Sequence, residues 1–218
     1  MRIVIAGGHG QVARRLERLL SARGHEPVGI IRNPKQGDDL RDAGAEPVYL
    51  DLESASVEQV AAVLQGAGAA VFAAGAGPGS GIARKETVDR GAAALFADAA
   101  ERTGVRRHIV LSSMGADADH EGDSVFDAYL RAKGAADDYV RSRPGLDWTI
   151  LRPGTLTNDA GTGLVKLAAS TGPGTVPRDD VAAVLAEMVE SPGTVGLTLE
   201  LISGSVPISV AVKDVAGN

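Results

Sequence analysis

The amino-acid sequence predicts a doubly wound α/β fold, with a mainly parallel sheet flanked by helices and a small cap near the C-terminal end. Two observations predict this class. Short apolar runs alternate with helical patterns from residue 2 to residue 151. The runs also lack a strict alternation of apolar and polar residues, as expected for strands that helices cover on both faces. Parallel strands joined through helices are expected to have right-handed connections.

Each expected strand is a short apolar run between glycine, proline or polar residues. The N-terminal run, Ile3-Val4-Ile5-Ala6, is the clearest. The expected strands lie at residues 2–6, 27–31, 47–50, 69–74, 108–111, 147–151 and 197–202, with a shorter one near 164–168.

Each expected helix follows a strand and has an apolar face or a recognisable end. Residues 11–23 place Val12, Leu16 and Leu20 on one face. Ser56 and Gln59 have the spacing of a capping box, and Gly104 can end an alanine-rich helix. The expected helices lie at residues 11–23, 35–43, 56–66, 86–103, 124–142 and 179–190.

Composition excludes several classes of protein. Glycine makes up 28 of the 218 residues, nearly twice its usual share of about 7%, but has no three-residue period, which excludes collagen. The chain has no cysteine, which excludes disulfides and thiolate metal sites and fits a reducing compartment. The net charge of −6, with acidic and basic residues interspersed, argues against a nucleic-acid surface.

No apolar run in the sequence has the pattern of a signal peptide or of a membrane-spanning helix. We therefore expect a cytoplasmic protein without membrane or nucleic-acid partners. It should be a single domain over residues 1–218, capped on the substrate side by segments within 153–218. A monomer or a homodimer fits this pattern. We expect no metal site, because the four histidines have no metal-ligand spacing.

A glycine-rich loop lies between the first strand and the first helix. The sequence there is Gly7-Gly8-His9-Gly10-Gln11-Val12-Ala13. Glycine allows a tight turn and lets the backbone approach a pyrophosphate, while the helix N-terminus offers free N–H groups to the anion. Placed after the N-terminal strand, the loop predicts dinucleotide binding by a Rossmann-like fold, with contacts from Gly7 through Val12.

The ends of the next strands refine the cofactor prediction. The second strand ends in Arg32, with Lys35 nearby, where an acidic residue would bind the ribose 2′-hydroxyl of NAD. A guanidinium suits a 2′-phosphate, so NADP(H) is preferred and NAD(H) is the alternative. The same two residues could instead be ordinary surface charges. Further expected cofactor contacts follow the third and fourth strands: Asp51, which could equally cap the next helix, Leu52, Ala73, Ala74 and Gly75.

Tyr129 and Lys133 lie four residues apart and share one face of an expected helix. Ser112 and Ser113 follow the fifth strand, at the sheet edge where ligands bind in doubly wound folds. A tyrosine with the usual pKa near 10 is a weak base at neutral pH, and an adjacent ammonium favours the tyrosinate. The spacing predicts hydride-transfer chemistry with Tyr129 as acid and base.

Over nearly its whole length the chain resembles the short-chain dehydrogenase/reductase superfamily, and in particular its NmrA-like, epimerase/dehydratase-like branch. The resemblance implies that Tyr129 is the acid/base and that Lys133 binds the nicotinamide ribose. Ser113 would orient the substrate, or Ser112 if the register differs by one residue. The motifs that carry the resemblance are Gly7 to Ala13, Arg32-Asn33-Pro34, Asp51-Leu52, Ser112-Ser113-Met114, Tyr129 with Lys133, Leu151-Arg152-Pro153-Gly154, Leu156-Thr157-Asn158 and the run from Pro177 to Ala182.

These features predict an NADP(H)-dependent oxidoreductase or epimerase/dehydratase-like enzyme that acts on a small carbonyl or hydroxyl substrate. Ser112, Lys133 and Pro153 are also expected to contact the cofactor. The alternative is an NmrA-like redox sensor that binds the dinucleotide without turnover, because many members of this branch lack a complete Ser-Tyr-Lys set. Arg152 could meet an anionic substrate or form a structural ion pair.

Overall fold

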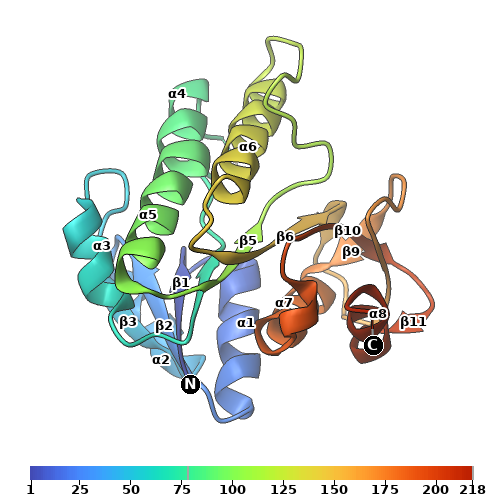
Figure 1. Ribbon diagram of the computed structural model, residues 1–218, viewed down its shortest axis with the longest axis horizontal. Coiled ribbons are helices and arrows are strands. Elements are labelled where there is room, and N and C mark those ends of the chain that lie inside the picture. The colour runs from blue at the N-terminus through green and yellow to red at the C-terminus, as the bar shows by residue number, and fades with distance from the viewer. Residues whose placement is uncertain (78, 218) are drawn as a thin grey trace.

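The computed structural model describes residues 1–77 and 79–217. Its main feature is a nine-stranded sheet with the order β11-β8-β10-β6-β5-β4-β1-β2-β3 (Figure 1). The strands from β3 to β10 in this order are parallel, whereas β8 is antiparallel to β10 and to β11. The sheet strands are β1 (Arg2–Ala6), β2 (Glu26–Ile31), β3 (Glu46–Tyr49), β4 (Ala69–Phe72), β5 (Arg107–Leu111), β6 (Asp147–Pro153), β8 (Leu164–Ala168), β10 (Leu197–Ser203) and β11 (Val206–Pro207).

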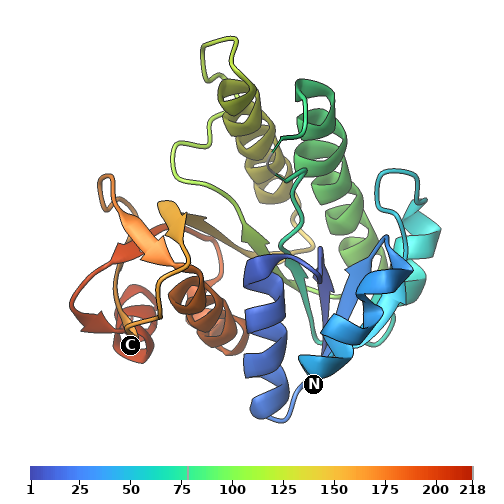
Figure 2. The ribbon, with the colours of Figure 1, turned by 180° about the vertical axis from the view of Figure 1, so that it is seen from behind.

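Helices cover both faces of the sheet, which confirms the predicted doubly wound α/β class. One face carries α1 (Gln11–Ala22), α7 (Arg178–Glu190) and α8 (Ile208–Val215) (Figures 1 and 2). The other face carries α3 (Val57–Leu64), α5 (Ala93–Thr103) and α6 (Val125–Arg141). The short helix α2 (Gly37–Asp42) packs near β3, after the 3₁₀ turn η1 (Pro34–Gln36). Among the described residues, no helix combines the length and apolar character needed to cross a membrane.

The central strand β1 shows why the apolar runs do not alternate with polar residues. Ile3 and Ile5 point into the core beneath α1, where Leu16 lies, while Val4 packs on the opposite face with Phe96 of α5. All of these side chains are completely buried. A strand covered on both faces must be apolar at every position, so the sequence of β1 follows from its central place.

The expected helix over residues 86–103 is divided into three parts. It begins earlier, as the short α4 (Ile82–Arg84), continues as the π-helical segment η2 (Lys85–Ala92), and becomes α-helical only in α5. A π-helix hydrogen-bonds five residues along the chain and occurs mostly as short inserts at functional sites. Lys85, Val88, Asp89 and Ala92 lie together on the buried side of η2.

The C-terminal third contributes more to the main sheet than the sequence predicts. The strands β8, β10 and β11 extend the sheet. Beside them, β7 (Thr155–Thr157) and β9 (Thr175–Pro177) form a separate two-stranded parallel sheet, and η3 (Pro192–Thr194) precedes β10. The strands β7, β9 and β11, of two or three residues each, are too short for the sequence pattern to detect, and α8 was also not predicted. The division into one domain with a substrate-side cap stays a prediction.

Candidate functional site

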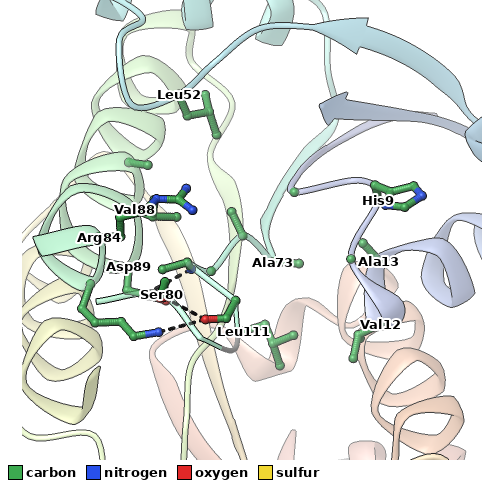
Figure 3. Close-up of a pocket in the computed structure, with 18 of the residues that line it drawn as sticks. His9, Val12, Ala13, Leu52, Ala73, Ser80, Arg84, Val88, Asp89 and Leu111 are labelled. Carbon is green, nitrogen blue, oxygen red and sulfur yellow. Dashed lines mark hydrogen bonds between the residues drawn. The ribbon is translucent and has the colours of Figure 1, made fainter. Parts of the chain in front are cut away.

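A cavity of about 1020 Å³ lies at the carboxyl ends of the parallel strands. Its wall includes residues that directly follow β1, β2, β3, β4 and β5 and the last residue of β6. Figure 3 shows His9 and Val12 on the wall opposite Arg84, Val88 and Asp89. The residues predicted from the sequence that line this cavity are Gly7, His9, Gly10, Gln11, Val12, Arg32, Asp51, Leu52, Ala73, Ala74, Gly75, Ser112, Tyr129, Lys133 and Pro153.

The glycine loop forms a tight turn at the start of α1. The Gly10 amide donates a hydrogen bond of 2.8 Å to the Gly7 carbonyl, and Gly10 then acts as the N-cap without a side-chain cap. The first N–H groups of α1 therefore have no acceptor within the helix. Gly7 has a φ of +80°, and a Cβ there would lie 2.6 Å from the Cα of Ala74. This bare backbone cradle and its N–H groups fit the pyrophosphate of a dinucleotide.

Gly8 is predicted to bind the cofactor but does not line the cavity. Its amide donates to the carbonyl of Ile30, and its Cα packs against Gly29 of β2. A Cβ at Gly8 would lie 2.8 Å from Oε1 of Glu17, a completely buried side chain of α1. Gly8 therefore supports the loop from behind, because only a glycine allows β1, β2 and α1 to come this close.

Arg32 lies on the cavity wall and shares a carboxylate with a second arginine. Nη1 of Arg32 is 3.1 Å from Oε2 of Glu53, and Nη2 of Arg84 is 2.6 Å from the same oxygen. The hydrogen bonds from Arg84 and Thr87 hold the pKa of Glu53 below its usual value. Lys35 does not line the cavity, because its turn in η1 directs it away from the wall.

Asp51 does not cap the next helix, because the N-cap of α3 is Ser56. Asp51 lines the cavity instead, and its Oδ1 accepts a hydrogen bond of 3.1 Å from the Glu53 amide. The carboxylate thus stabilises the turn that carries Glu53. His9 is also on the wall, with its Nε2 2.6 Å from Oδ2 of Asp39.

Helix α6 places Tyr129 and Lys133 on the cavity wall, one turn apart. Lys133 is buried, and its Nζ donates to the carbonyls of Ala74, at 3.3 Å, and Leu111, at 3.2 Å. The same ammonium is 3.4 Å from Oδ1 of Asp89, which is completely buried on η2. Through these contacts Lys133 connects α6 with η2 and with the ends of β4 and β5. They also fix the position of its positive charge.

The Tyr129 ring is half-buried and is surrounded by an aromatic ring and two ammonium groups. It stacks on Phe126 at a centroid distance of 5.9 Å. Nζ of Lys85 lies 5.4 Å from the centre of the Tyr129 ring, and Nζ of Lys133 lies 6.0 Å from it. The face of an aromatic ring attracts cations, so these contacts fix the Tyr129 ring beside the two ammonium groups.

The structure separates the two candidate serines. Ser112 is buried on the cavity wall, and its Oγ donates a hydrogen bond of 2.9 Å to Oδ2 of Asp137. Ser113 does not line the cavity, and its Oγ donates to the carbonyl of Met114. Burial raises the pKa of Asp137, and the neighbouring Arg152 opposes this shift. Arg152 forms an ion pair of 2.8 Å with Asp137, which is the structural alternative considered for it.

The sequence reading missed several charged residues on the cavity wall: Glu53, Arg84, Lys85, Asp89 and Arg178. Lys85 and Asp89 have a helical spacing of four, and this could have indicated a shared face. The helix was expected to begin at residue 86, however, which left Lys85 outside it. Arg178 lies at the start of α7, and its Nη1 donates to Oδ1 of Asn158 at 3.0 Å.

The chain is similar to several known proteins over almost its full length. It is 34% identical over 214 residues to a protein of Bacillus subtilis named as the uncharacterized sugar epimerase YhfK, with 98% of this chain and 99% of the relative covered. A solved structure from Bacillus halodurans, provisionally named as an NAD-dependent epimerase/dehydratase, is 38% identical, with a TM-score of 0.91 and coverage of 98% and 99%. The oxidoreductase YlbE from Lactococcus lactis is 26% identical, with a TM-score of 0.86 and coverage of 100% and 98%.

Residues 7–192 match the family described as NAD(P)H-binding. The match begins in the glycine loop and includes all of the residues that line the cavity. It agrees with the NmrA-like, epimerase/dehydratase-like branch to which the sequence motifs point. The chain therefore belongs to the NAD(P)H-binding family, a group of Rossmann-fold proteins related to oxidoreductases and epimerases.

Proposed function

We propose that this protein is an NADP(H)-dependent oxidoreductase that interconverts a carbonyl and a hydroxyl group on a small substrate. The observation that carries the proposal is a single cavity that joins the glycine loop to the Tyr129 ring, with the Lys133 ammonium fixed beside that ring. The relatives named as an oxidoreductase and as epimerases support the same chemistry.

In the proposed reaction, Tyr129 moves the proton. A bound reduced nicotinamide supplies a hydride to the carbonyl carbon of the substrate. The Tyr129 hydroxyl donates its proton to the carbonyl oxygen as that oxygen becomes negative, and the tyrosinate then recovers a proton from solvent. Lys133 stabilises the tyrosinate from one side, because Asp89 and the carbonyls of Ala74 and Leu111 keep its Nζ in place. In the reverse direction the tyrosinate removes the proton of a substrate hydroxyl.

We assign substrate orientation to Ser112, with Ser113 as the alternative. The Ser112 proton is directed at Asp137, so its oxygen can accept a hydrogen bond from a substrate hydroxyl. Its place on the cavity wall supports this role.

The preference for NADP(H) over NAD(H) is also part of the proposal. Two guanidinium groups, those of Arg32 and Arg84, share the single carboxylate of Glu53. The two guanidinium groups lie beside the ends of β2 and β3, where the 2′-phosphate of NADP(H) is expected, and together they exceed the charge of the carboxylate that they share.

The test of the proposal is the rate of NADPH oxidation over a panel of carbonyl compounds, with Tyr129→Phe as the variant. We expect kcat to fall at least about 100-fold, because general acid catalysis contributes about 10² to 10⁴. The Kd for NADPH should stay within about twofold. A variant with the full rate contradicts the role of Tyr129. Dinucleotide binding without turnover of any carbonyl favours the redox-sensor alternative.

The two serines form a matched pair for the orienting role. Ser112→Ala should lower kcat/KM, while Ser113→Ala should leave it nearly unchanged. The opposite result would move the role to Ser113. A fall in thermal stability for Ser112→Ala without a change in kcat/KM would show that Ser112 has only a structural role, through its hydrogen bond to Asp137.

A further inference from the structure

Lys85 is a buried ammonium on the cavity wall that lacks a neutralising carboxylate. Only 8% of the residue is exposed. Its Nζ donates one hydrogen bond, of 3.2 Å, to the carbonyl of Gly77. Within residues 1–77 and 79–217, no carboxylate oxygen lies within 4.0 Å of this nitrogen. An ammonium has three donors, so two of them have no protein acceptor there.

The neighbouring charges do not compensate Lys85. Asp89 is the nearest acidic residue along the buried side of η2, but its Oδ2 accepts from the Ala76 amide and its Oδ1 faces Lys133. On the same wall, Arg84 is paired with Glu53. Two ammonium groups therefore face the Tyr129 ring with one carboxylate between them, which leaves one net positive charge.

Burying a charge without a partner is unfavourable, so the position of Lys85 needs an explanation. The Tyr129 ring face, 5.4 Å away, stabilises the ammonium only in part. The cofactor phosphates do not explain it either, because the pyrophosphate is expected at the glycine loop and the 2′-phosphate is expected at Arg32 and Arg84. Figure 3 shows Val12 of that loop on the wall opposite Arg84, the residue that precedes Lys85.

The surroundings of Lys85 also contain an apolar surface. Phe126 is 62% exposed and stacks on Tyr129. A ligand that reaches the Tyr129 hydroxyl can therefore place an apolar body on Phe126 and an anionic group near Lys85. A carboxylate can accept the free donors of the ammonium and neutralise its charge.

We infer that Lys85 binds a carboxylate of the substrate, and that the substrate is a small carbonyl compound with a carboxylate close to the reacting carbon. This inference rests on the proposed function, because it takes Tyr129 as the residue at the reacting carbon. It assigns Lys85 to substrate selection and leaves the proton transfer to Tyr129.

The first experiment measures binding, without turnover. Benzoate and benzamide have nearly the same shape and differ in charge, and each is titrated by calorimetry into the NADPH-loaded protein. We expect benzoate to bind more tightly than benzamide. Lys85→Met should weaken benzoate by about 10- to 100-fold, the value of a hydrogen bond between charged groups. Lys85→Arg should keep most of the benzoate affinity, and benzamide should bind all variants alike.

Lys213→Met is the matched control, because Lys213 lies on α8, away from the cavity. It should leave both affinities unchanged. An NADPH Kd within about twofold of the unsubstituted protein shows that each variant is folded. Equal binding of benzoate and benzamide, no measurable benzoate binding, or unchanged benzoate binding by Lys85→Met would each overturn the inference.

The second experiment separates this inference from the proposed function. Benzoylformate and its methyl ester present similar carbonyls, and only the first carries a negative charge. We expect Lys85→Met to lower kcat/KM for benzoylformate at least about tenfold and to leave the ester within about threefold. Ester turnover without a preference for the anion defeats the inference and leaves the proposed function intact. Charge-selective benzoate binding without any turnover defeats the proposed function and supports the role of Lys85.

Discussion

Around the cavity, several charged side chains form ion pairs within the protein, whereas others, such as Lys85, do not. Arg32 and Arg84 share Glu53, and Lys133 faces Asp89. These pairs hold the side chains in place before any ligand binds. They also lower the net attraction for an anion, since each carboxylate repels the phosphate that a guanidinium attracts.

Replacing Glu53 with glutamine should strengthen the binding of NADP(H). The change removes one negative charge near the expected 2′-phosphate and leaves a side chain that can still accept hydrogen bonds. A charge–charge energy of about 1 kcal/mol in a water-exposed setting corresponds to roughly a fivefold lower Kd. Fluorescence titration with NADPH and NADH measures it, with NADH changing less than about twofold.

Arg32→Ala is the converse test, and it should weaken NADPH more than NADH. Glu121→Gln is the control, because Glu121 is an exposed residue outside the cavity. Equal effects on the two cofactors in Glu53→Gln and in Arg32→Ala would contradict the preference for NADP(H).

At the scale of elements, the N-terminal cap of α6 supports the candidate site, because Tyr129 lies in the turns that follow this cap. Ser124 and Asp127 form a capping box, in which Ser124 Oγ accepts from the Asp127 amide at 3.1 Å and Asp127 Oδ2 accepts from the Ser124 amide at 2.9 Å. Hydrogen bonds from Ser124 and then from His120 lower the pKa of Asp127 to about 2. The cap therefore stays formed over the neutral pH range, and Tyr129 lies just after it.

Ser124→Ala should affect both stability and activity. Removing an N-cap serine costs about 1 kcal/mol, measured as the free energy of unfolding in urea. Loosening the first turn of α6 should also lower the rate of NADPH oxidation, because Tyr129 and Phe126 lie in the first two turns. Ser56→Ala is the matched control, since Ser56 caps α3 with the same type of capping box, outside the cavity. An equal loss of activity in the two variants would show that the activity of Tyr129 does not depend on the Ser124 cap.

The elements also show what local sequence can predict. The spacing of Tyr129 and Lys133 and the position of the glycine loop follow from helical periodicity and from the order of strands and helices. The π-helical form of η2 does not, because no residue type in this segment indicates a π turn. The expected helix also began at residue 86, so the sequence predicted neither the ion pair between Asp89 and Lys133 nor the place of Lys85.

For the whole molecule, the parallel sheet could be predicted because each strand and its helix form a local unit. In the C-terminal third the sequence predicted β8, α7 and β10 as elements but not the antiparallel pairing of β8 with β10. That pairing joins strands across a long connection, so local preference does not determine it. The same limit applies to the contact of Ser112 with Asp137 of α6, a carboxylate that Arg152 of β6 also binds.

Two buried titratable side chains, without hydrogen-bond partners among the described residues, affect the stability of the whole fold in opposite ways. Burial raises the pKa of Glu17 to about 8, and the nearby Arg14 only partly opposes this. Burial lowers the pKa of His108 to about 4, and Arg107 adds to the shift. Both side chains are therefore neutral in the folded protein near pH 6.

Their contributions to the pH dependence of stability have opposite signs. Between about pH 4.5 and 8 the folded state keeps a proton on Glu17 that the unfolded state has lost, so stability falls as pH rises. Between about pH 4 and 6.5 the unfolded state carries a proton on His108 that the folded state lacks, so stability rises with pH. The two slopes cancel from about pH 4.5 to 6.5.

Glu17→Gln should change the shape of the stability profile. Without Glu17, urea unfolding should show stability rising up to about pH 6.5 and no fall due to this group above it. The gain at pH 8 should be on the order of 3 kcal/mol. Glu121→Gln changes the same functional group on the surface, so its profile should follow that of the unsubstituted protein. Parallel profiles for Glu17→Gln and the unsubstituted protein would contradict the neutral form of Glu17.

The π-helical segment η2 makes this fold sensitive to the length of the chain and not only to its composition. Each residue of an α-helix turns the chain by about 100°. Deleting one residue from η2 would allow a regular α-helix, which is locally the better-formed structure. The register of the residues before the deletion would then change relative to α5, and Lys85 would shift along the cavity wall. A deletion could therefore produce a well-folded protein whose substrate range has changed without any substitution in the site.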